Sequence, residues 1–468
     1  MSESAELKKA LRPTDVFAIA VGSIIGFGCF VLPGDWLLES GPLGFSIAFI
    51  LGALMIIVIG KSYGFMINEY PVAGGGFAFA YKGFGRTQAY ICGWMLTLGY
   101  LSVVALNATA IPIIIRFIAP TLLTRGYLYS VVGWDVYAAE ILVSVSAVLL
   151  FAYLNYKGSD AMGKIQTFMV GLLFAAVILL ALGSFMLSGA PVSNLYPLFA
   201  PNKTAFASVV SILAVAPTAY LGFDTIPHAA EEFDFAPSEA FKLIVLAILS
   251  GGAIYIIVAL GTAMPYPWLD IINKDMVWAT GDAMKAAMGT FGLLFLVVGV
   301  LMGICTGMNG FYMATSRLLL SMARAKVLPN WFAKIHPTYQ TPVNSILFTM
   351  VFGLLLPWFG RTAILWIIDM CTIGTAVSFF YTCFTSYKMI KEANPQSREA
   401  TIHLVGASFS LLFLGLLCIP GSPAFMVIES WVCLISWLSL GLVFYLAKAK
   451  SYRAVPKREL DMLILNKA

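Results

Sequence analysis

The sequence contains little charge, few histidines and no long polar segment. Of its 468 residues, 11% are charged and 60% are hydrophobic. Soluble domains carry about 25% charged residues, so the composition excludes a soluble globular protein. The three histidines, His228, His336 and His403, are too dispersed for a metal cluster, and the HExxH and GxSxG motifs of hydrolytic enzymes are missing. We therefore expect a protein that is not an enzyme and that holds neither a metal nor a cofactor.

The cysteines and the basic residues also lack a functional pattern. Nearly all of the seven cysteines lie inside apolar runs, where a free cysteine behaves as a small hydrophobic residue, and their spacing fits neither a disulfide framework nor a zinc site. The net charge is +5, and the 28 Lys and Arg residues are spread over many connecting segments. Because they form no basic patch, we expect no nucleic-acid partner.

Long apolar runs dominate the sequence instead, and the mean hydropathy is +0.89. Runs of about 18 to 25 apolar residues match the length that a helix needs to cross a bilayer core about 30 Å thick. A hydropathy window of about 19 residues predicts about twelve spans, near residues 15–38, 41–65, 89–118, 134–154, 165–188, 205–230, 241–264, 291–322, 343–360, 362–386, 402–420 and 424–447. The sequence therefore predicts an all-α, multi-pass membrane protein whose surroundings are the lipid bilayer.

The basic residues predict the orientation of these spans. If the N-terminus is cytoplasmic, the Lys and Arg residues left on the outside are few: Arg116, Arg125, Lys203, Lys274, Lys285 and Arg361. By the positive-inside rule we expect both termini in the cytoplasm and the protein in the inner or plasma membrane of the cell. The opening MSESAELKKALRPTD is short and basic, and the apolar segment after it is too long for the core of a signal peptide, so we interpret it as the first span.

Two predicted spans are interrupted by glycine and proline. In the first, residues 21–34 read VGSIIGFGCFVLPG, and in the sixth, residues 216–232 read APTAYLGFDTIPHAAEE. Backbone groups left unpaired at membrane depth are tolerated where they line a cavity enclosed by protein. The letters GFG at 26–28 correspond to GFD at 222–224, and because five spans precede the sixth, the two copies would have opposite membrane topology. Such a pair of interrupted spans is typical of a transporter binding site.

The interruptions also have a structural explanation, because membrane helices use glycine and proline for close packing. Either interruption alone would fit that explanation, whereas two at corresponding positions favour a transporter. The amides that begin the outer half of the first span could bind a carboxylate, and the carbonyl ends of the preceding half-helices could accept hydrogen bonds from an ammonium group. An amino acid, or an amine alone, would satisfy such a site.

Several segments, taken in order, resemble the amino acid-polyamine-organocation transporter superfamily over roughly residues 13–447. They are GSIIGFG (22–28), EYPVAGGGFAFAYKGFG (69–85), GW (93–94), NYKGSDAMGKIQ (155–166), YLGFDTIPHAAEE (220–232), and MATSRLLLSMARAKVLP (313–329) before TPVNS (341–345). The resemblance implies a leucine-transporter-like fold. This fold has a five-plus-five inverted repeat, discontinuous helices 1 and 6, two additional C-terminal helices, and alternating access around the broken helices.

The resemblance also implies a division of the chain and a function. The expected parts are a cytoplasmic N-terminal tail (1–14), a transporter core of two inverted five-helix repeats (15–390), helices 11 and 12 (391–447) and a cytoplasmic C-terminal tail (448–468). The implied function is secondary active transport of amino acids, as a permease that imports its substrate with protons. An amine or polyamine permease, or an amino acid/amine exchanger, is the alternative. A substrate-sensing receptor or an intramembrane enzyme fits the residues less well.

Carried over by position, the resemblance implies the residues that bind substrate: Ile24, Gly26, Phe27, Gly28, Ala219, Tyr220, Leu221 and Gly222. Thr218 lies where some relatives carry a gating aromatic residue, so the gate formed by that residue is either missing here or supplied by Tyr220. Phe27 departs from the family, in which this residue is usually small, and its ring could narrow the pocket or rotate out of it. Leu173 aligns with the lysine that proton-coupled relatives often carry in the fifth helix, which argues against lysine-based proton coupling.

Three ionisable residues lie at membrane depth. A charged Asp at the bilayer centre costs about 2.5 to 3.5 kcal/mol on insertion scales, so Asp224 is a candidate for binding a substrate amine or a coupling proton. Alternatively, Asp224 caps the inner half of the sixth helix. His228 could shuttle protons or pack at a helix end. Asp369 could line an outer vestibule, or it could pair with Arg361 or a backbone group.

Polar residues on the eighth span and after the sixth span give two further candidates. Thr306 and Asn309 are one helical turn apart and could supply oxygen ligands to a sodium ion, although such side chains mostly bond to neighbouring helices. Glu231 and Glu232 begin an inside segment, where they could form an inner gate with basic residues or remain solvated.

Overall fold

Ten helices in the described part of the chain are long and apolar enough to cross a membrane. The computed structural model describes residues 7–131, 134–270, 278–422 and 425–466. The ten helices are α3 (Pro33–Glu69), α5 (Arg86–Ile118), α7 (Ala138–Lys157), α8 (Ser159–Leu182), α11 (Ala240–Ala263), α13 (Ala279–Arg324), α14 (Val343–Leu355), α15 (Ala363–Ala393), α16 (Glu399–Cys418) and α17 (Ile428–Ala454). The bent pair formed by α9 (Ala205–Leu213) and residues 217–232 would make an eleventh. The predicted all-α membrane fold is confirmed.

The first predicted span is split into short pieces. α1 (Pro13–Ile24) is apolar but has 12 residues, which is too few to cross a bilayer. The chain leaves helical geometry at Ile25 and Gly26 and resumes as α2 (Phe27–Val31), which leads into α3. Inside α3, Gly41 has a φ of 68°, a conformation that glycine tolerates, and the helix is kinked there. This kink lies at the boundary predicted between the first and second spans.

The sixth predicted span is split as well. Its second part, residues 217–232, is bent by 46° from α9. The short α10 (Ala216–Ala219) is followed by the 3-10 helix η3 (Phe223–Glu232), and the residue before η3 is Gly222, with a φ of 133°. The discontinuities predicted in helices 1 and 6 are therefore both present.

Shorter elements connect the spans: α4 (Gly76–Phe84), α6 (Pro120–Leu123), β1 (Tyr127–Val131), β2 (Trp134–Tyr137), η1 (Gly183–Leu187), η2 (Val192–Leu195), η4 (Pro237–Glu239), η5 (Asn330–Ala333), η6 (Leu356–Thr362) and α18 (Lys457–Leu465). β1 and β2 pair as an antiparallel hairpin. The predicted fourth span, 134–154, begins inside this hairpin, whereas the helix α7 begins after β2, so hydropathy placed the start of that span too early.

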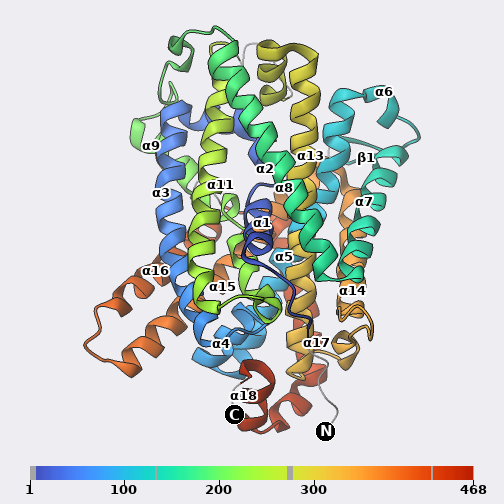
Figure 1. The fold of residues 1–468 in the computed structure, drawn as a ribbon, viewed down its shortest axis with the longest axis vertical. Coiled ribbons are helices and arrows are strands. Elements are labelled where there is room, and N and C mark those ends of the chain that lie inside the picture. The colour runs from blue at the N-terminus through green and yellow to red at the C-terminus, as the bar shows by residue number, and fades with distance from the viewer. Residues whose placement is uncertain (1–6, 132–133, 271–277, 423–424, 467–468) are drawn as a thin grey trace.

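The broken first segment lies in the middle of the bundle, enclosed by other helices. α1 packs against α8, α11, α13 and η3 (Figure 1). The unpaired backbone at the breaks is therefore enclosed by protein and not exposed to lipid.

Glycine permits close helix contacts elsewhere in the bundle. A Cβ atom added to Gly374 of α15 would lie 2.4 Å from the carbonyl oxygen of Met95 in α5, so these two helices touch through their backbones.

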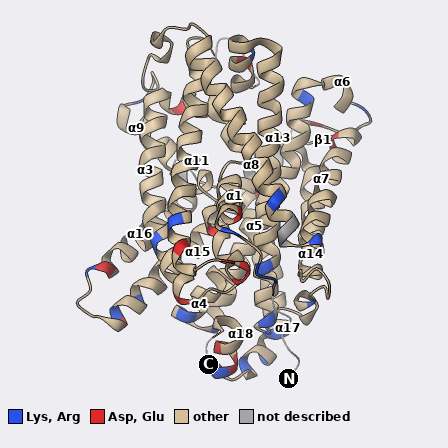
Figure 2. Cartoon of the chain, viewed as in Figure 1, with Lys and Arg blue, Asp and Glu red and all other residues tan. Residues whose placement is uncertain are grey.

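The two ends of the bundle differ in charge. α18 lies at one end, the lower end in Figure 1, and the segment leading into α1 approaches from the same end. We call this the terminal end and the opposite end the distal end. Figure 2 shows that Lys and Arg gather toward the terminal end, around α17 and α18.

Candidate functional site

The two interrupted segments cross in contact with each other beside Gly222. A Cβ atom added to Gly222 would lie 2.6 Å from the backbone nitrogen of Ile24 and 2.6 Å from the carbonyl carbon of Ser23. Real Cβ atoms do not approach backbone so closely, and the positive φ of Gly222 disfavours a side chain as well. The crossing of the two breaks therefore requires glycine at this position.

A cavity of about 470 Å³ lies beside this crossing. Most of the predicted substrate-binding and gating residues line it: Ile24, Gly26, Phe27, Gly28, Thr218, Ala219 and Leu221. α2 begins at Phe27. Because the first amides of a helix have no acceptor within that helix, they can donate to an anionic group in the cavity. The structure thus brings together the residues that the sequence placed at the two breaks.

Three polar residues that the sequence analysis missed also line the cavity: Ser23, Asn107 and Tyr255. The Oγ atom of Ser23 and the Oδ1 atom of Asn107 are buried and have no hydrogen-bond partner, whereas the Nδ2 atom of Asn107 donates to the carbonyl oxygen of Val103 at 3.0 Å. The Tyr255 hydroxyl donates to the carbonyl oxygen of Ile24 at 3.3 Å. A buried acceptor without a partner is costly, so Ser23 and Asn107 are candidates for binding a ligand, although the Ser23 hydroxyl lies against Gly310 of α13. An asparagine inside an apolar span was the signal that could have identified Asn107.

The remaining cavity wall is apolar, with two carboxylates. Phe27, Trp36 and Phe311 supply aromatic surface, and the described residues that line the cavity include Asp35 and Asp369 but no Lys, Arg or His. The Oδ2 atom of Asp369 accepts a hydrogen bond from the Ser430 hydroxyl at 2.6 Å. Asp369 therefore lines the cavity, as one of its two predicted roles requires. Its other predicted role, pairing with Arg361, involves a side chain outside the described residues.

The cavity reaches the surface at the distal end. Phe425 and Val427, which line it, are 41% and 40% exposed. They immediately precede α17, whose other end leads into α18 at the terminal end. A helix of 27 residues is about 40 Å long at 1.5 Å per residue, so the exposed residues before α17 lie on the opposite side of the bundle from α18.

Tyr220 and Gly222 are not among the residues that line the cavity. The Tyr220 side chain is fully buried, and its hydroxyl donates to the carbonyl oxygen of Phe49 at 2.7 Å. Its ring packs against the ring of Phe49, with 5.8 Å between the centroids. Thr218 lines the cavity and shares a hydrogen bond with Thr372 of α15. Of the two predicted gating residues, Thr218 alone has access to the cavity.

Asp224 and His228 are buried beneath the crossing and also do not line the cavity. The Oδ1 atom of Asp224 accepts from the backbone N–H of Gly222 at 3.0 Å, and its Oδ2 atom accepts from the Tyr100 hydroxyl at 2.8 Å. Asp224 is the second residue of η3, and its carboxylate satisfies the backbone N–H of Gly222, the residue just before this helix. A ring nitrogen of His228, Nδ1, donates to the carbonyl oxygen of Ala73 at 3.0 Å, and Nε2 has no partner.

Thr306 and Asn309, the predicted sodium ligands, are engaged by protein groups. The Thr306 hydroxyl donates to the carbonyl oxygens of Gly22 at 3.0 Å and Gly303 at 2.8 Å. The Asn309 amide accepts from Asn155 of α7 at 2.9 Å and donates to Gln166 of α8 at 2.8 Å.

Gln166 completes this network between α1, α8 and α13. Its Nε2 atom donates to the carbonyl oxygens of Ala18 and Thr306, each at 3.2 Å. A neutral amide therefore lies between α1 and α13 and bonds to Asn309, one of the two predicted sodium ligands. Leu173, which the sequence placed at the lysine position of the fifth helix, is fully buried apolar packing.

Buried charges seal the terminal end. Arg317 of α13 and Glu232 of η3 form an ion pair through two hydrogen bonds, of 2.7 and 3.3 Å, and both side chains are 1% exposed. Beside it, Arg324 donates to Glu231 at 2.9 Å, and the other carboxylate oxygen of Glu231 accepts from the backbone N–H of Ala73 at 3.0 Å. The two glutamates therefore pair with basic residues instead of remaining solvated, and we call the two ion pairs the ionic gate.

The chain before α1 adds a backbone bridge to this gate. The N–H groups of Ala10 and Leu11 donate to the carbonyl oxygen of Glu232 at 3.0 and 2.9 Å. The N–H group of Asp234 donates to the carbonyl oxygen of Leu11 at 3.0 Å, so Leu11 and Phe233 form a parallel bridge. The start of the first broken segment and the end of the second are thus held together at the terminal end.

Comparisons of the sequence with known proteins match transporters over most of the chain. The family model for amino acid permeases matches residues 11–443 of the chain. A branched-chain amino acid permease of Bacillus subtilis is 25% identical over 96% of this chain and 95% of its own length. A methylthioribose transporter of the same organism is 25% identical over 97% of this chain and 96% of its own length. A vacuolar cationic amino acid transporter of Arabidopsis thaliana is 26% identical over 80% of this chain and 62% of its own length.

Proposed function

Because this chain belongs to the amino acid permease family, we propose that it is a secondary transporter that moves an amino acid through the cavity by alternating access. Members of the family are transporters, so the chain is not an enzyme. One observation carries the proposal: two broken segments cross beside a cavity that is open at the distal end and sealed at the terminal end. Access from one end at a time is what a transporter requires in order not to leak.

The cavity wall supports a neutral amino acid as the substrate. The first amides of α2 would bind the substrate carboxylate, and the unpaired oxygens of Asn107 and Ser23 would accept from its ammonium group. Apolar and aromatic surface remains for the side chain. The two carboxylates of the wall disfavour an acidic substrate, and they support a second candidate, a cationic amino acid or amine. The named substrates of the relatives include both neutral and cationic amino acids.

Within this proposal the coupling ion is a proton and the candidate carrier is Asp224. Sodium is not favoured, because protein groups already engage Thr306 and Asn309. Asp224 bonds to the amide of Gly222, which lies at the crossing of the two breaks. Protonation would weaken this bond, so the proton would change the geometry of the second break directly.

We also propose that both termini are cytoplasmic and that the protein resides in the plasma membrane. The excess of basic residues at the terminal end supports this orientation. The cavity then faces the outside, in a state ready to take up substrate. The division of the chain into a core, helices 11 and 12 and two tails remains part of this proposal.

Uptake by the purified protein in proteoliposomes tests the function. A labelled panel of neutral, acidic and basic amino acids, ethanolamine and putrescine is offered with and without an inward proton gradient. We expect a neutral amino acid to accumulate with the gradient and an acidic one not to be taken up. The variant Asp224→Asn should lose gradient-driven accumulation while it still exchanges internal for external substrate.

The alternatives give different results in the same assay. Uptake that needs substrate preloaded inside the vesicles, in both the native protein and Asp224→Asn, identifies an exchanger and contradicts proton coupling. Uptake of putrescine in preference to every amino acid supports the second candidate. If no compound in the panel is taken up, the transport proposal fails.

A further inference from the structure

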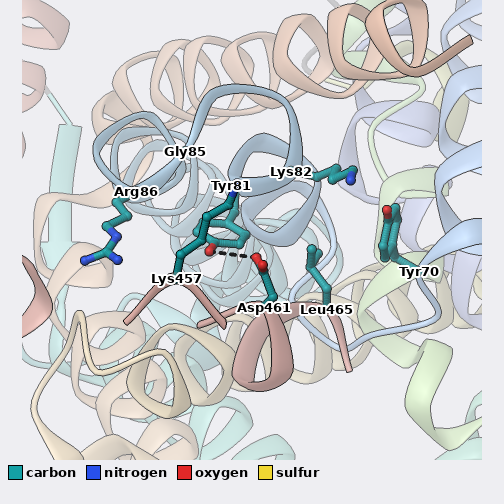
Figure 3. A pocket seen from close by; sticks show the side chains of 8 residues that line it. All are labelled: Tyr70, Tyr81, Lys82, Gly85, Arg86, Lys457, Asp461 and Leu465. Atoms are coloured by element: carbon teal, nitrogen blue, oxygen red, sulfur yellow. Dashed lines mark hydrogen bonds between the residues drawn. The ribbon is translucent and has the colours of Figure 1, made fainter. Parts of the chain in front are cut away.

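The C-terminal helix α18 is attached to the terminal end of the bundle by side chains from distant parts of the sequence. The Tyr81 hydroxyl of α4 donates to Asp461 at 2.9 Å, a bond drawn in Figure 3. Burial and the neighbouring Asp461 carboxylate raise the pKa of Tyr81, so its hydroxyl keeps the proton that it donates. Glu459 forms an ion pair with Lys326, which follows α13. α18 is thus fixed to two elements, at α4 and beyond α13.

Arg86 fixes the chain just before α18. Its guanidinium donates to three backbone carbonyl oxygens, those of Tyr452 at 3.0 Å, Arg453 at 2.8 Å and Val455 at 2.6 Å. A guanidinium carries several donors in a rigid planar group, so one side chain can bind a turn of backbone in a single orientation. These bonds set the direction in which the chain leaves α17 and enters α18.

One face of α18 is apolar and buried. Leu460, Ile464 and Leu465 are 0%, 1% and 5% exposed, and Leu465 reaches the cavity of about 440 Å³ between α4 and α18 that Figure 3 shows. A helix of nine residues is too short to be stable by itself in water. α18 is therefore held by these contacts, and losing them would release it.

α18 also forms one wall of a second cavity, of about 680 Å³, whose other walls include the ionic gate. Met462, Leu463 and Asn466 line it from α18 and its end, and Glu231 and Arg324 line it from the gate. Ala230, Glu231, Phe233 and Phe235 line the same cavity, so it offers space to this segment when the gate opens. α18 therefore lies beside the gate, at the end of the bundle that is closed.

We propose that α18 is a latch that keeps the terminal end closed, so that its release favours the conformation open to that end. The inference rests on the proposed transport function and goes beyond it, because it assigns control of the conformational equilibrium to the C-terminal helix. The contacts to α4 and Lys326 hold α18 in place, and α18 in turn limits the space available to the gate.

A cysteine behind the gate reports the conformation. Leu221 lines the distal cavity and is 4% exposed. In a background with the native cysteines replaced, Leu221→Cys is reacted with a membrane-impermeant maleimide applied from the terminal side of reconstituted protein. Removing residues 457–468 should raise this rate at least about tenfold and lower the rate from the distal side, because the population shifts between two states.

Charge exchange at the ion pair between Lys326 and Glu459 provides a test that keeps the chain intact. Lys326→Glu should raise labelling from the terminal side about threefold to fivefold, since an exposed pair contributes up to about 1 kcal/mol. The double variant Lys326→Glu with Glu459→Lys should restore the native rate. Lys203→Glu, which removes an exposed pair with Glu39 at the distal end, is the matched control and should leave terminal-side labelling unchanged.

Two results separate the latch from the transport function. If the intact protein switches its labelling between sides when substrate is added, but the deletion and Lys326→Glu leave both rates unchanged, the latch proposal is wrong and transport stands. If Leu221→Cys is never labelled from the terminal side in the intact protein, with or without substrate, alternating access itself fails.

Discussion

The distal and terminal ends of the bundle carry different kinds of ion pair. At the distal end, Lys203 and Glu39 form an ion pair whose side chains are 34% and 57% exposed, beside an open cavity. At the terminal end, Arg317 and Glu232 form a pair that is 1% exposed on both sides. An exposed ion pair contributes about 0 to 1 kcal/mol to stability, whereas removing one partner of a buried pair costs about 3 to 5 kcal/mol. The seal at the terminal end therefore stabilises the conformation open to the distal end.

This difference indicates how a reversible gate can be built. A buried ion pair costs free energy to desolvate, so it stabilises the closed state only while both partners stay together. When η3 moves away from α13, both charges regain water. The cost of desolvating the two charges offsets part of the free energy gained by pairing them. Substrate binding at the crossing of the two breaks can therefore change which end is closed.

The largest effect is expected from breaking the buried pair. Glu232→Gln leaves Arg317 buried without a countercharge and should destabilise the closed terminal end by about 3 to 5 kcal/mol. Labelling of Leu221→Cys from the terminal side should rise by more than about a hundredfold. The double variant Glu232→Gln with Arg317→Met removes both charges and should recover most of the seal. A native labelling rate in Glu232→Gln would show that this pair does not close the terminal end.

The cavity end can be tested at its unpaired acceptor. Asn107→Ala removes a hydrogen bond to the substrate ammonium, which is worth about 1.5 to 3 kcal/mol for a charged partner. The apparent affinity for a neutral amino acid should fall about 10- to 150-fold, measured by substrate-dependent thermal stabilisation. Asn344→Ala, whose amide donates outside the cavity to Trp331, is the control. An unchanged affinity in Asn107→Ala would exclude Asn107 from the site.

A smaller and more selective effect is expected at the cavity carboxylate. Asp369→Asn should leave uptake of a neutral amino acid within about twofold of native, since the charge does not pair with a neutral side chain. Uptake of a cationic amino acid should fall further, by about threefold to tenfold. Competition between lysine and leucine for uptake measures the difference. Equal losses for both substrates would indicate that Asp369 acts through packing with Ser430 and not through charge.

The smallest effect is expected at the exposed pair of the distal end. Lys203→Ala should change the free energy of unfolding by less than about 1 kcal/mol, as measured by thermal unfolding in detergent. Transport and labelling from both sides should stay at native levels. If Lys203→Ala destabilised the protein by about 3 to 5 kcal/mol, as expected for the closed end in Glu232→Gln, the two ends would not differ.

The spans and the two breaks were predictable because their signals are local. Apolar runs, the glycines around residue 26 and the boundary between the first and second spans near Gly41 can be read from consecutive residues. Once both breaks are placed beside one cavity, Gly222 and Ile24 are expected to lie near each other. The sequence does not give the distance between them. Hydropathy predicts about twelve spans, whereas ten of the described helices are long and apolar enough to cross a membrane. The broken first segment explains part of this difference, because α1 by itself is too short to count as a span.

The site itself was predicted in part. Ser23, Asn107 and Tyr255 were missed because their role depends on which face of each helix is turned toward the cavity. The family resemblance placed Tyr220 in the pocket, but its ring packs against Phe49 and its hydroxyl bonds to the Phe49 carbonyl oxygen. The partner of Glu232 could not be identified, because Arg317 comes from another helix 85 residues away.

The most direct test of alternating access is the sided reactivity of Leu221→Cys in the intact, reconstituted protein. Without substrate, the account predicts fast reaction with an impermeant maleimide from the distal side and very slow reaction from the terminal side. A transported amino acid should slow the distal reaction and speed the terminal one. Equal reaction from both sides without substrate, or rates that no substrate changes, would contradict the account.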